Sequence, residues 1–287
     1  MLEIRLLGEQ RIIGGPDRGG RAPSSRSVAL LGYLIVHSEV PQARQYLAGI
    51  FWPDSSEAQA RTNLRRELHN LRALLGDDPS LIVQPTTLNW RDSATCRVDV
   101  RVFETQRKAA LRARARDDSA GFANHAHAAI AEYRGELMPG IYDDWVLDGR
   151  EILLRECVDL CDGVIVASRV AGDRSGAIEV ARRRVQLKPL EEAGYRVLIE
   201  LQAESGDRAA AVSTYHRCAT VLEQELGVTP DPETSMMVDR LLDRREVPAK
   251  PVAPTRDSSP RNGAAAPGLV GRVSEIERVM ERWRRAT

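Results

Sequence analysis

A leucine stripe between Ser55 and Gly76 constrains the fold of this chain more than any other feature. The stripe consists of Leu64, Leu68, Leu71 and Leu75. Its spacing predicts a helix with one narrow apolar face. At about 100° per residue, the remaining surface carries guanidinium, amide, hydroxyl and imidazole groups. Such groups reach phosphates and base edges in a DNA major groove, although an ordinary solvated amphipathic helix has the same pattern.

The polar residues of this helix divide by their direction from the stripe. Those expected to read bases are, in order of preference, Arg66, His69, Asn70, Thr62 and Arg65. Those expected to contact phosphates or to complete the polar face are Arg61, Arg72 and Asn63. A recognition helix uses both kinds of contact, because phosphates position it and base edges specify the sequence. For each residue the alternative interpretation is a solvated side chain with no partner.

The sequence before this helix predicts a small mixed region. Alternating apolar residues over 2–6 predict a half-buried strand, and Ile12-Ile13 predicts a second one before a glycine-rich turn. Ser24 or Ser25 is expected to cap a first helix. A shorter second helix is expected to end near Trp52-Pro53, because proline cannot continue a helix.

Beyond the leucine stripe the sequence predicts a β-hairpin. Apolar runs at 81–83 and 88–90 flank the turn signal 84–87, and alternation over 96–102 predicts a further strand. The tip of the hairpin supplies the last candidates for DNA contact, Thr86 and Thr87. A plain turn is the alternative for this tip. Three helices followed by a hairpin are typical of a winged helix-turn-helix, and a preceding sheet is typical of its OmpR type.

After Val102 the pattern is helical to about Arg245, with an internal repeat. Gly172-Asp173-Arg174 recurs as Gly206-Asp207-Arg208, an offset of 34 residues. This is the tetratricopeptide period, in which each repeat is a pair of antiparallel helices. Each Gly-Asp pair therefore predicts the turn between two helices. Stacked repeats of this kind bind other proteins along a concave face.

The expected fold class is mainly α with a small β component. An OmpR-type winged helix-turn-helix precedes an all-α tetratricopeptide-like domain. The expected domains are residues 1–97 and 98–246. Five prolines indicate a linker at 247–268, and residues 269–287 read as the start of a further domain.

Composition and motifs argue against several other functions. The 41 basic and 41 acidic residues balance, so any DNA affinity must come from local clustering of charge. The four cysteines lack zinc-ligand spacing and are expected to be buried thiols, so we expect no metal and no cofactor. No Gly-Lys pair exists for a phosphate loop, so the chain is not expected to be an enzyme. No apolar run is long enough to span a membrane, and a cytoplasmic location is expected.

The N-terminal region resembles the winged-helix domain of the Streptomyces antibiotic regulatory protein family, the AfsR-like activators. The matching segments are the strand positions Leu2, Ile4 and Leu6, the run Phe51–Asp54, and the run Asn63–Gly76. The following region resembles the bacterial transcriptional activation domain found with it. Its matching segments are Val98–Glu104, Tyr133–Gly140, Asp144–Val146 and Glu225–Pro230. Residues 269–272 resemble the opening of the ATPase domain in larger family members.

This resemblance implies a sequence-specific transcriptional activator. It implies that the partners are double-stranded promoter DNA with direct repeats, a second protomer on that DNA, and RNA polymerase holoenzyme. Two other classes of function remain open at this point. One is a protein-interaction scaffold built on the helical repeats. The other is a regulatory fragment of a signal-transduction NTPase. Salt-dependent DNA affinity would separate the activator from the scaffold.

Overall fold

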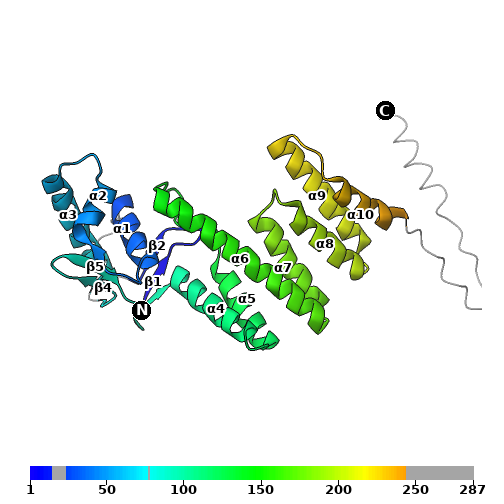
Figure 1. Ribbon diagram of the computed structural model, residues 1–287, viewed down its shortest axis with the longest axis horizontal. Coiled ribbons are helices and arrows are strands. Elements are labelled where there is room, and N and C mark those ends of the chain that lie inside the picture. Colours follow the sequence, from blue (N-terminus) through cyan, green and yellow to red (C-terminus); the bar gives the residue numbers. More distant parts are fainter. Residues whose placement is uncertain (15–23, 77, 244–287) are drawn as a thin grey trace, which may run out of the picture. The chain divides into compact units, whose positions relative to one another are not determined.

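The strands of the N-terminal region form two small sheets in the computed structural model, which describes residues 1–14, 24–76 and 78–243. The strands are β1 (Leu2–Arg5), β2 (Arg11–Ile13), β3 (Gln42–Ala43), β4 (Leu81–Val83), β5 (Thr87–Trp90) and β6 (Cys96–Val98). Within the described residues, one sheet has the order β2-β1-β6 and the other the order β3-β5-β4 (Figure 1). β1 pairs antiparallel with β2 and parallel with β6, so the two ends of this region meet in one sheet.

Three helices lie between these strands in the chain. They are α1 (Ser25–Val36), α2 (Arg44–Phe51) and α3 (Glu57–Leu75). The Ser24 side chain accepts a hydrogen bond from the amide of Ser27 and caps α1, and Ser56 caps α3 in the same way through Gln59. Gly76 ends α3 with a φ of 65°, a conformation that favours glycine. The predicted cap of α1 and the predicted end of α2 near Trp52-Pro53 are confirmed, with Ser24 rather than Ser25 as the cap.

The leucine stripe of α3 lies in the core, as predicted. Its four leucines are between 0 and 4 % exposed. They belong to the same core as Leu30, Leu31 and Leu34 of α1, and α3 contacts both α1 and α2. Burial of a leucine stabilises a fold by about 1.5–3 kcal/mol, so the stripe fixes which face of α3 is turned outward.

The strand predicted over residues 96–102 is wrong in its second half. β6 ends at Val98, and a helix begins at Asp99. Val100 and Phe103 are both buried three residues apart, so the helical period of this segment outweighs its alternation. Asp99 sits in the first turn of the helix, where a carboxylate interacts favourably with the helix dipole.

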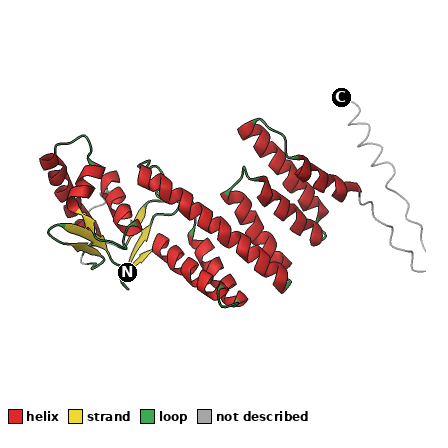
Figure 2. Cartoon of the chain, viewed as in Figure 1, coloured by secondary structure: helices red, strands yellow, loops and turns green. Residues whose placement is uncertain are grey.

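The remainder of the described chain is helical (Figure 2). Its helices are α4 (Asp99–Arg114), α5 (Ser119–Glu132), α6 (Asp144–Ala171), α7 (Arg174–Leu187), α8 (Glu192–Glu204), α9 (Arg208–Leu226) and α10 (Pro232–Asp243). The pairs α4/α5, α6/α7 and α8/α9 pack as successive hairpins (Figure 1). The expected linker and the segment that begins at residue 269 lie outside the described residues.

The two Gly-Asp turns found in the sequence do separate paired helices. Gly172 ends α6 in the left-handed region, and Asp173 caps α7; Asp207 caps α9 in the same way. The same turn occurs a third time between α4 and α5, where Asp118 caps α5. The sequence comparison missed it because Asp117, with a φ of 56°, replaces the glycine. The 28-residue helix α6 also breaks the 34-residue offset.

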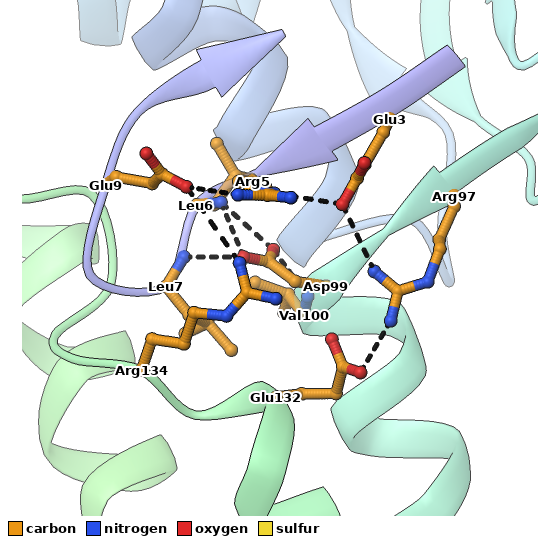
Figure 3. Close-up of polar contacts among 10 residues, drawn as sticks. All are labelled: Glu3, Arg5, Leu6, Leu7, Glu9, Arg97, Asp99, Val100, Glu132 and Arg134. Carbon is orange, nitrogen blue, oxygen red and sulfur yellow. Dashed lines mark hydrogen bonds and ion pairs between the residues drawn. The ribbon is translucent and has the colours of Figure 1, made fainter. Parts of the chain in front are cut away.

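Asp99 joins the N-terminal sheet to the first helix of the helical region (Figure 3). Its carboxylate is 1 % exposed and accepts hydrogen bonds of 2.9–3.0 Å from the amides of Leu6 and Leu7. It also accepts one of 2.8 Å from the amide of Val100. Burial raises the pKa of Asp99 above its ordinary value, although these amides oppose the shift. Nearby, Arg97 forms ion pairs with Glu3 and Glu132 at the surface.

The segment Gly135–Gly140 between α5 and α6 forms a second connection to the N-terminal sheet. The Met138 amide donates to the carbonyl of Leu6 at 2.7 Å, and the Gly8 amide donates to the carbonyl of Glu136 at 2.9 Å. Arg150 of α6 donates to the carbonyls of Leu137, Met138 and Ile141 at 2.7–2.8 Å. Together with Asp99, this segment packs the N-terminal sheet against the helical region within one compact unit.

Candidate nucleic-acid interface

The outward face of α3 is broad and polar. The exposed candidates on it are Arg61, Thr62, Arg65, Arg66, His69 and Arg72. The half-buried candidates on it are Asn63 and Asn70. All eight belong to the helix surface that the leucine stripe leaves outside the core, so one rigid element presents them together.

The arginines and the histidine on this face differ in how they are already paired. The side chains of Arg65, His69 and Arg72 have no hydrogen bond or ion pair within the described part of the chain. Arg66 lies 3.6 Å from the carboxylate of Glu67, and its side chain is 68 % exposed. Arg61 forms an ion pair with Glu57 one turn earlier. Unpaired arginines carry no internal partner that a phosphate would have to displace.

Three of the polar candidates make contacts within the protein. Thr62 Oγ1 donates to the carbonyl of Ala58 at 2.9 Å, one turn earlier. Asn63 Oδ1 accepts from Gln59 at 3.1 Å, and Asn70 Nδ2 donates to Glu67 at 3.3 Å. These bonds orient the side chains but leave each of them with further hydrogen-bonding capacity.

Glu67 is the residue of α3 that the sequence analysis missed. It is 5 % exposed, and its Oε2 accepts from Ser24 Oγ at 2.9 Å and from Ser27 Oγ at 2.6 Å. Burial raises the pKa of Glu67, but the hydrogen bonds from Ser27 and Ser24 outweigh it and hold the pKa below its ordinary value. This carboxylate ties α3 to the start of α1 and thereby sets the orientation of the polar face.

The hairpin turn is shorter than predicted. Gln84, Pro85 and Thr86 are exposed at its tip, whereas Thr87 is the first residue of β5 and half-buried. Thr87 Oγ1 donates to Gln84 Oε1 at 3.0 Å and closes the turn. The third strand of this sheet, β3, was not predicted, because two residues carry no detectable alternation.

The rest of the described chain contains no cluster of three or more histidine, cysteine, aspartate or glutamate residues arranged for a metal ion. The four cysteines are buried and free, as predicted. Burial raises the pKa of Cys96 to about 12, so its thiol is a packing group at neutral pH. Within the same residues, every helix is too short or too polar to cross a membrane.

Comparison with known families defines the class of the chain. The profile of the bacterial transcriptional activator domain matches residues 98–242, which is half of the sequence. The match begins at the junction of β6 and α4 and ends within α10. The chain therefore belongs to the bacterial transcriptional activator domain family.

Individual relatives extend the similarity into the N-terminal region. The transcriptional regulatory protein EmbR of Mycobacterium tuberculosis is 26 % identical over 262 residues, which cover 88 % of this chain and 66 % of EmbR. MoaR1 of the same species is 24 % identical over 255 residues and is covered to 78 %. AfsR of Streptomyces griseus is 24 % identical over 251 residues, and the chain spans 25 % of its length. The chain thus spans a quarter of the length of AfsR and slightly less than two thirds of the length of EmbR.

One solved structure supports the fold. M. tuberculosis EmbR in complex with a low-affinity phosphopeptide matches with a TM-score of 0.60 at 24 % identity. The match covers 86 % of this chain and 66 % of that chain. It shows that the N-terminal region and the helical region occur together in one known fold.

Proposed function

We propose that the chain is a DNA-binding transcriptional activator of the Streptomyces antibiotic regulatory protein type. One observation carries this proposal: α3 turns the exposed side chains of Arg61, Arg65, Arg66 and Arg72 outward, while its leucine stripe and Glu67 anchor the opposite side. In this proposal the protein works by docking and recruitment, with no bond made or broken. The similarity to EmbR, MoaR1 and AfsR supports a role in transcription.

The proposed DNA-binding domain is an OmpR-type winged helix-turn-helix at residues 1–97. The helix α3 enters the major groove, where Arg66, His69 and Asn70 read base edges. The hairpin acts as the wing, and Thr86 with Thr87 contacts the adjacent backbone or groove. Arg61 and Arg72 bind phosphates.

The proposed activator domain covers residues 98–246 and stacks tetratricopeptide-like helix pairs. The three capped hairpin turns support this architecture. Its surface contacts RNA polymerase holoenzyme and a second protomer bound to the neighbouring half of a direct repeat in the promoter. Residues 247–268 serve as a linker, and residues 269–287 begin an ATPase domain of a larger regulator. The proposed location is the cytoplasm.

The direct test is DNA affinity as a function of salt. An activator that neutralises several phosphates should lose affinity steeply as salt rises, with a slope of about −0.9 per phosphate. The duplexes are taken from the promoter region of the gene's own neighbourhood, located by footprinting. A chain with no measurable affinity for any of these duplexes would favour the scaffold or the NTPase fragment instead.

Arg66 and Arg72 are expected to differ in what they contribute. Arg66→Ala should cost about 1–3 kcal/mol on the specific site and relax preference at one base position. Arg72→Ala should weaken binding to specific and random duplexes by the same factor, because a phosphate contact carries no sequence information. Titration of both variants against a set of single-base operator changes measures the difference. Uniform losses for both variants would contradict the division of roles.

Two protomers are expected to bind side by side on direct repeats. With half-sites about 10–11 bp apart, both recognition helices face the same side of the DNA. Insertion of about five base pairs moves one half-site to the opposite face and should abolish cooperative binding. Insertion of a full turn is the control, because it restores the same face. Cooperativity that survives the half-turn insertion would rule out the tandem arrangement.

A further inference from the structure

A hollow of about 450 Å³ lies between the start of α2, the middle of α3 and the tip of the hairpin. Its lining residues are Ala43, Arg44, Gln45, Arg61, Leu64, Arg65, Pro85 and Thr86. It therefore sits where the proposed recognition helix and the proposed wing meet. Arg44 and Gln45 lie outside the predicted recognition helix, so neither was a candidate for DNA contact from the sequence.

Three arginines from two helices line this hollow: Arg44 of α2, and Arg61 and Arg65 of α3. The side chain of Arg65 has no partner within the described residues, and that of Arg44 donates one long bond of 3.4 Å to the carbonyl of Gln84. Arg61 pairs with Glu57, which also accepts from Gln45 at 3.0 Å. The three arginines and Glu57 together carry a formal charge of +2. A monoanion of suitable size would thus be held by charge as well as by hydrogen bonds.

The first residues of α2 also border the hollow. Ala43, the N-cap of α2, provides no side-chain hydrogen bond to the first turn of that helix. The Arg44 amide donates to the carbonyl of Thr86 at 2.9 Å and holds the hairpin against α2. The first turn of α2 therefore borders the hollow with its positive dipole end. Its aliphatic lining is limited to Ala43, Leu64 and Pro85.

We propose that this hollow binds one phosphodiester of the DNA backbone, held by Arg44 and Arg65. The inference rests on the proposed function and adds the backbone contact that lies between the groove and the wing. It also changes the role of Arg65, which the sequence analysis placed among the base readers. Arg65 shares the hollow with Arg44 and Arg61, whereas Arg66, His69 and Asn70 are not among its lining residues.

The first experiment compares Arg44→Gln with Arg112→Gln in the full chain. Arg112 is an exposed arginine of α4 away from the hollow and serves as the matched control. Arg44→Gln should reduce affinity about tenfold on specific and random duplexes alike, and the salt slope should fall by about 1. Arg112→Gln should leave both quantities unchanged. Equal thermal unfolding midpoints for the two variants confirm that Arg44→Gln still folds.

The second experiment locates the phosphate by replacing single phosphates of the duplex with neutral methylphosphonates. At one position, the neutral phosphate should weaken DNA binding by the unmodified protein. The same replacement should not weaken DNA binding by Arg44→Gln any further, because both changes remove the same contact. Losses that add at every position would overturn the proposal. Arg65→Gln should behave as Arg44→Gln does; a loss of base preference instead would return Arg65 to base reading.

A third experiment tests whether the hollow binds a free phosphate ion instead of a DNA phosphodiester. Inorganic phosphate without DNA should stabilise the unmodified protein no more than it stabilises Arg44→Gln in a thermal unfolding assay. Stabilisation at micromolar phosphate that Arg44→Gln abolishes would identify a free anion as the ligand and overturn the backbone assignment. Failure of the proposed function is a separate result, because the unmodified protein would then bind no duplex at all.

Discussion

Asp99→Ala is expected to lower the free energy of unfolding by about 3–5 kcal/mol. The carboxylate is buried and accepts hydrogen bonds from the amides of Leu6 and Leu7, and both leucines are buried as well, so the substitution leaves two buried donors without their acceptor. Each of these amides left unsatisfied costs about 1–3 kcal/mol. The loss is measured by urea denaturation, with fluorescence and circular dichroism followed on the same samples.

Two comparisons make the Asp99 result specific. Asp159→Ala removes an exposed aspartate of α6 and should change stability by less than about 0.5 kcal/mol. Asp99→Asn keeps one oxygen acceptor but places its NH₂ group opposite a backbone N–H, and two donors cannot bond each other. Its loss in the free energy of unfolding should therefore lie between those of the two other variants. A change below about 1 kcal/mol for Asp99→Ala would mean that other contacts carry the connection between the sheet and α4.

Gly32→Ala and Gly49→Ala are expected to have opposite effects, with a difference of about 2–4 kcal/mol in the free energy of unfolding. A Cβ at Gly32 would overlap with the sulfur of Met138, which is fully buried. A Cβ at Gly49 would meet no atom within 4 Å. Gly49→Ala should therefore stabilise the protein through helix propensity alone, by about 0.5–1 kcal/mol.

The Met138 side chain is the expected cause of the Gly32 effect. The added Cβ would lie 2.2 Å from the Met138 sulfur and 2.6 Å from its methyl group. The Met138 side chain is fully buried, so it can move aside only by displacing its neighbours. Met138→Ala creates space at Gly32, so the double variant should be less destabilised than the sum of the two single changes. Additive effects in this cycle would show that the overlap is relieved elsewhere.

Much of the local structure could be predicted because its causes are local. Ser24, Ser56 and Gly76 mark helix ends through bonds and dihedral angles within a few residues. The leucine stripe of α3 predicted which face is buried, and thus which polar candidates are exposed. For the candidate interface, the sequence pattern predicted the helix, its exposed arginines and the nearby hairpin. The roles of individual side chains on DNA stay predictions.

The predictions failed where a residue's neighbours come from distant parts of the chain. The strand at 96–102 was extended too far, because Val100 alternates in sequence but packs in a helix. β3 exists only through its pairing with β5, and its two residues have no strand pattern of their own. Glu67 resembles any solvated acid in the sequence, yet two serines 40 and 43 positions away bury and bond it.

The residue order alone was enough to predict α1, the end of α2, the buried face of α3, and two of the three capped turns between paired helices. These features depend on spacing and on short-range hydrogen bonds, which are already present in the order of residues. Two groupings became visible only in the folded chain: Arg44 lines one hollow with Arg61 and Arg65, and Asp99 accepts hydrogen bonds from the amides that follow β1. Such groupings join residues that are far apart in the sequence. Tertiary packing chooses these partners, and the local sequence pattern does not identify them.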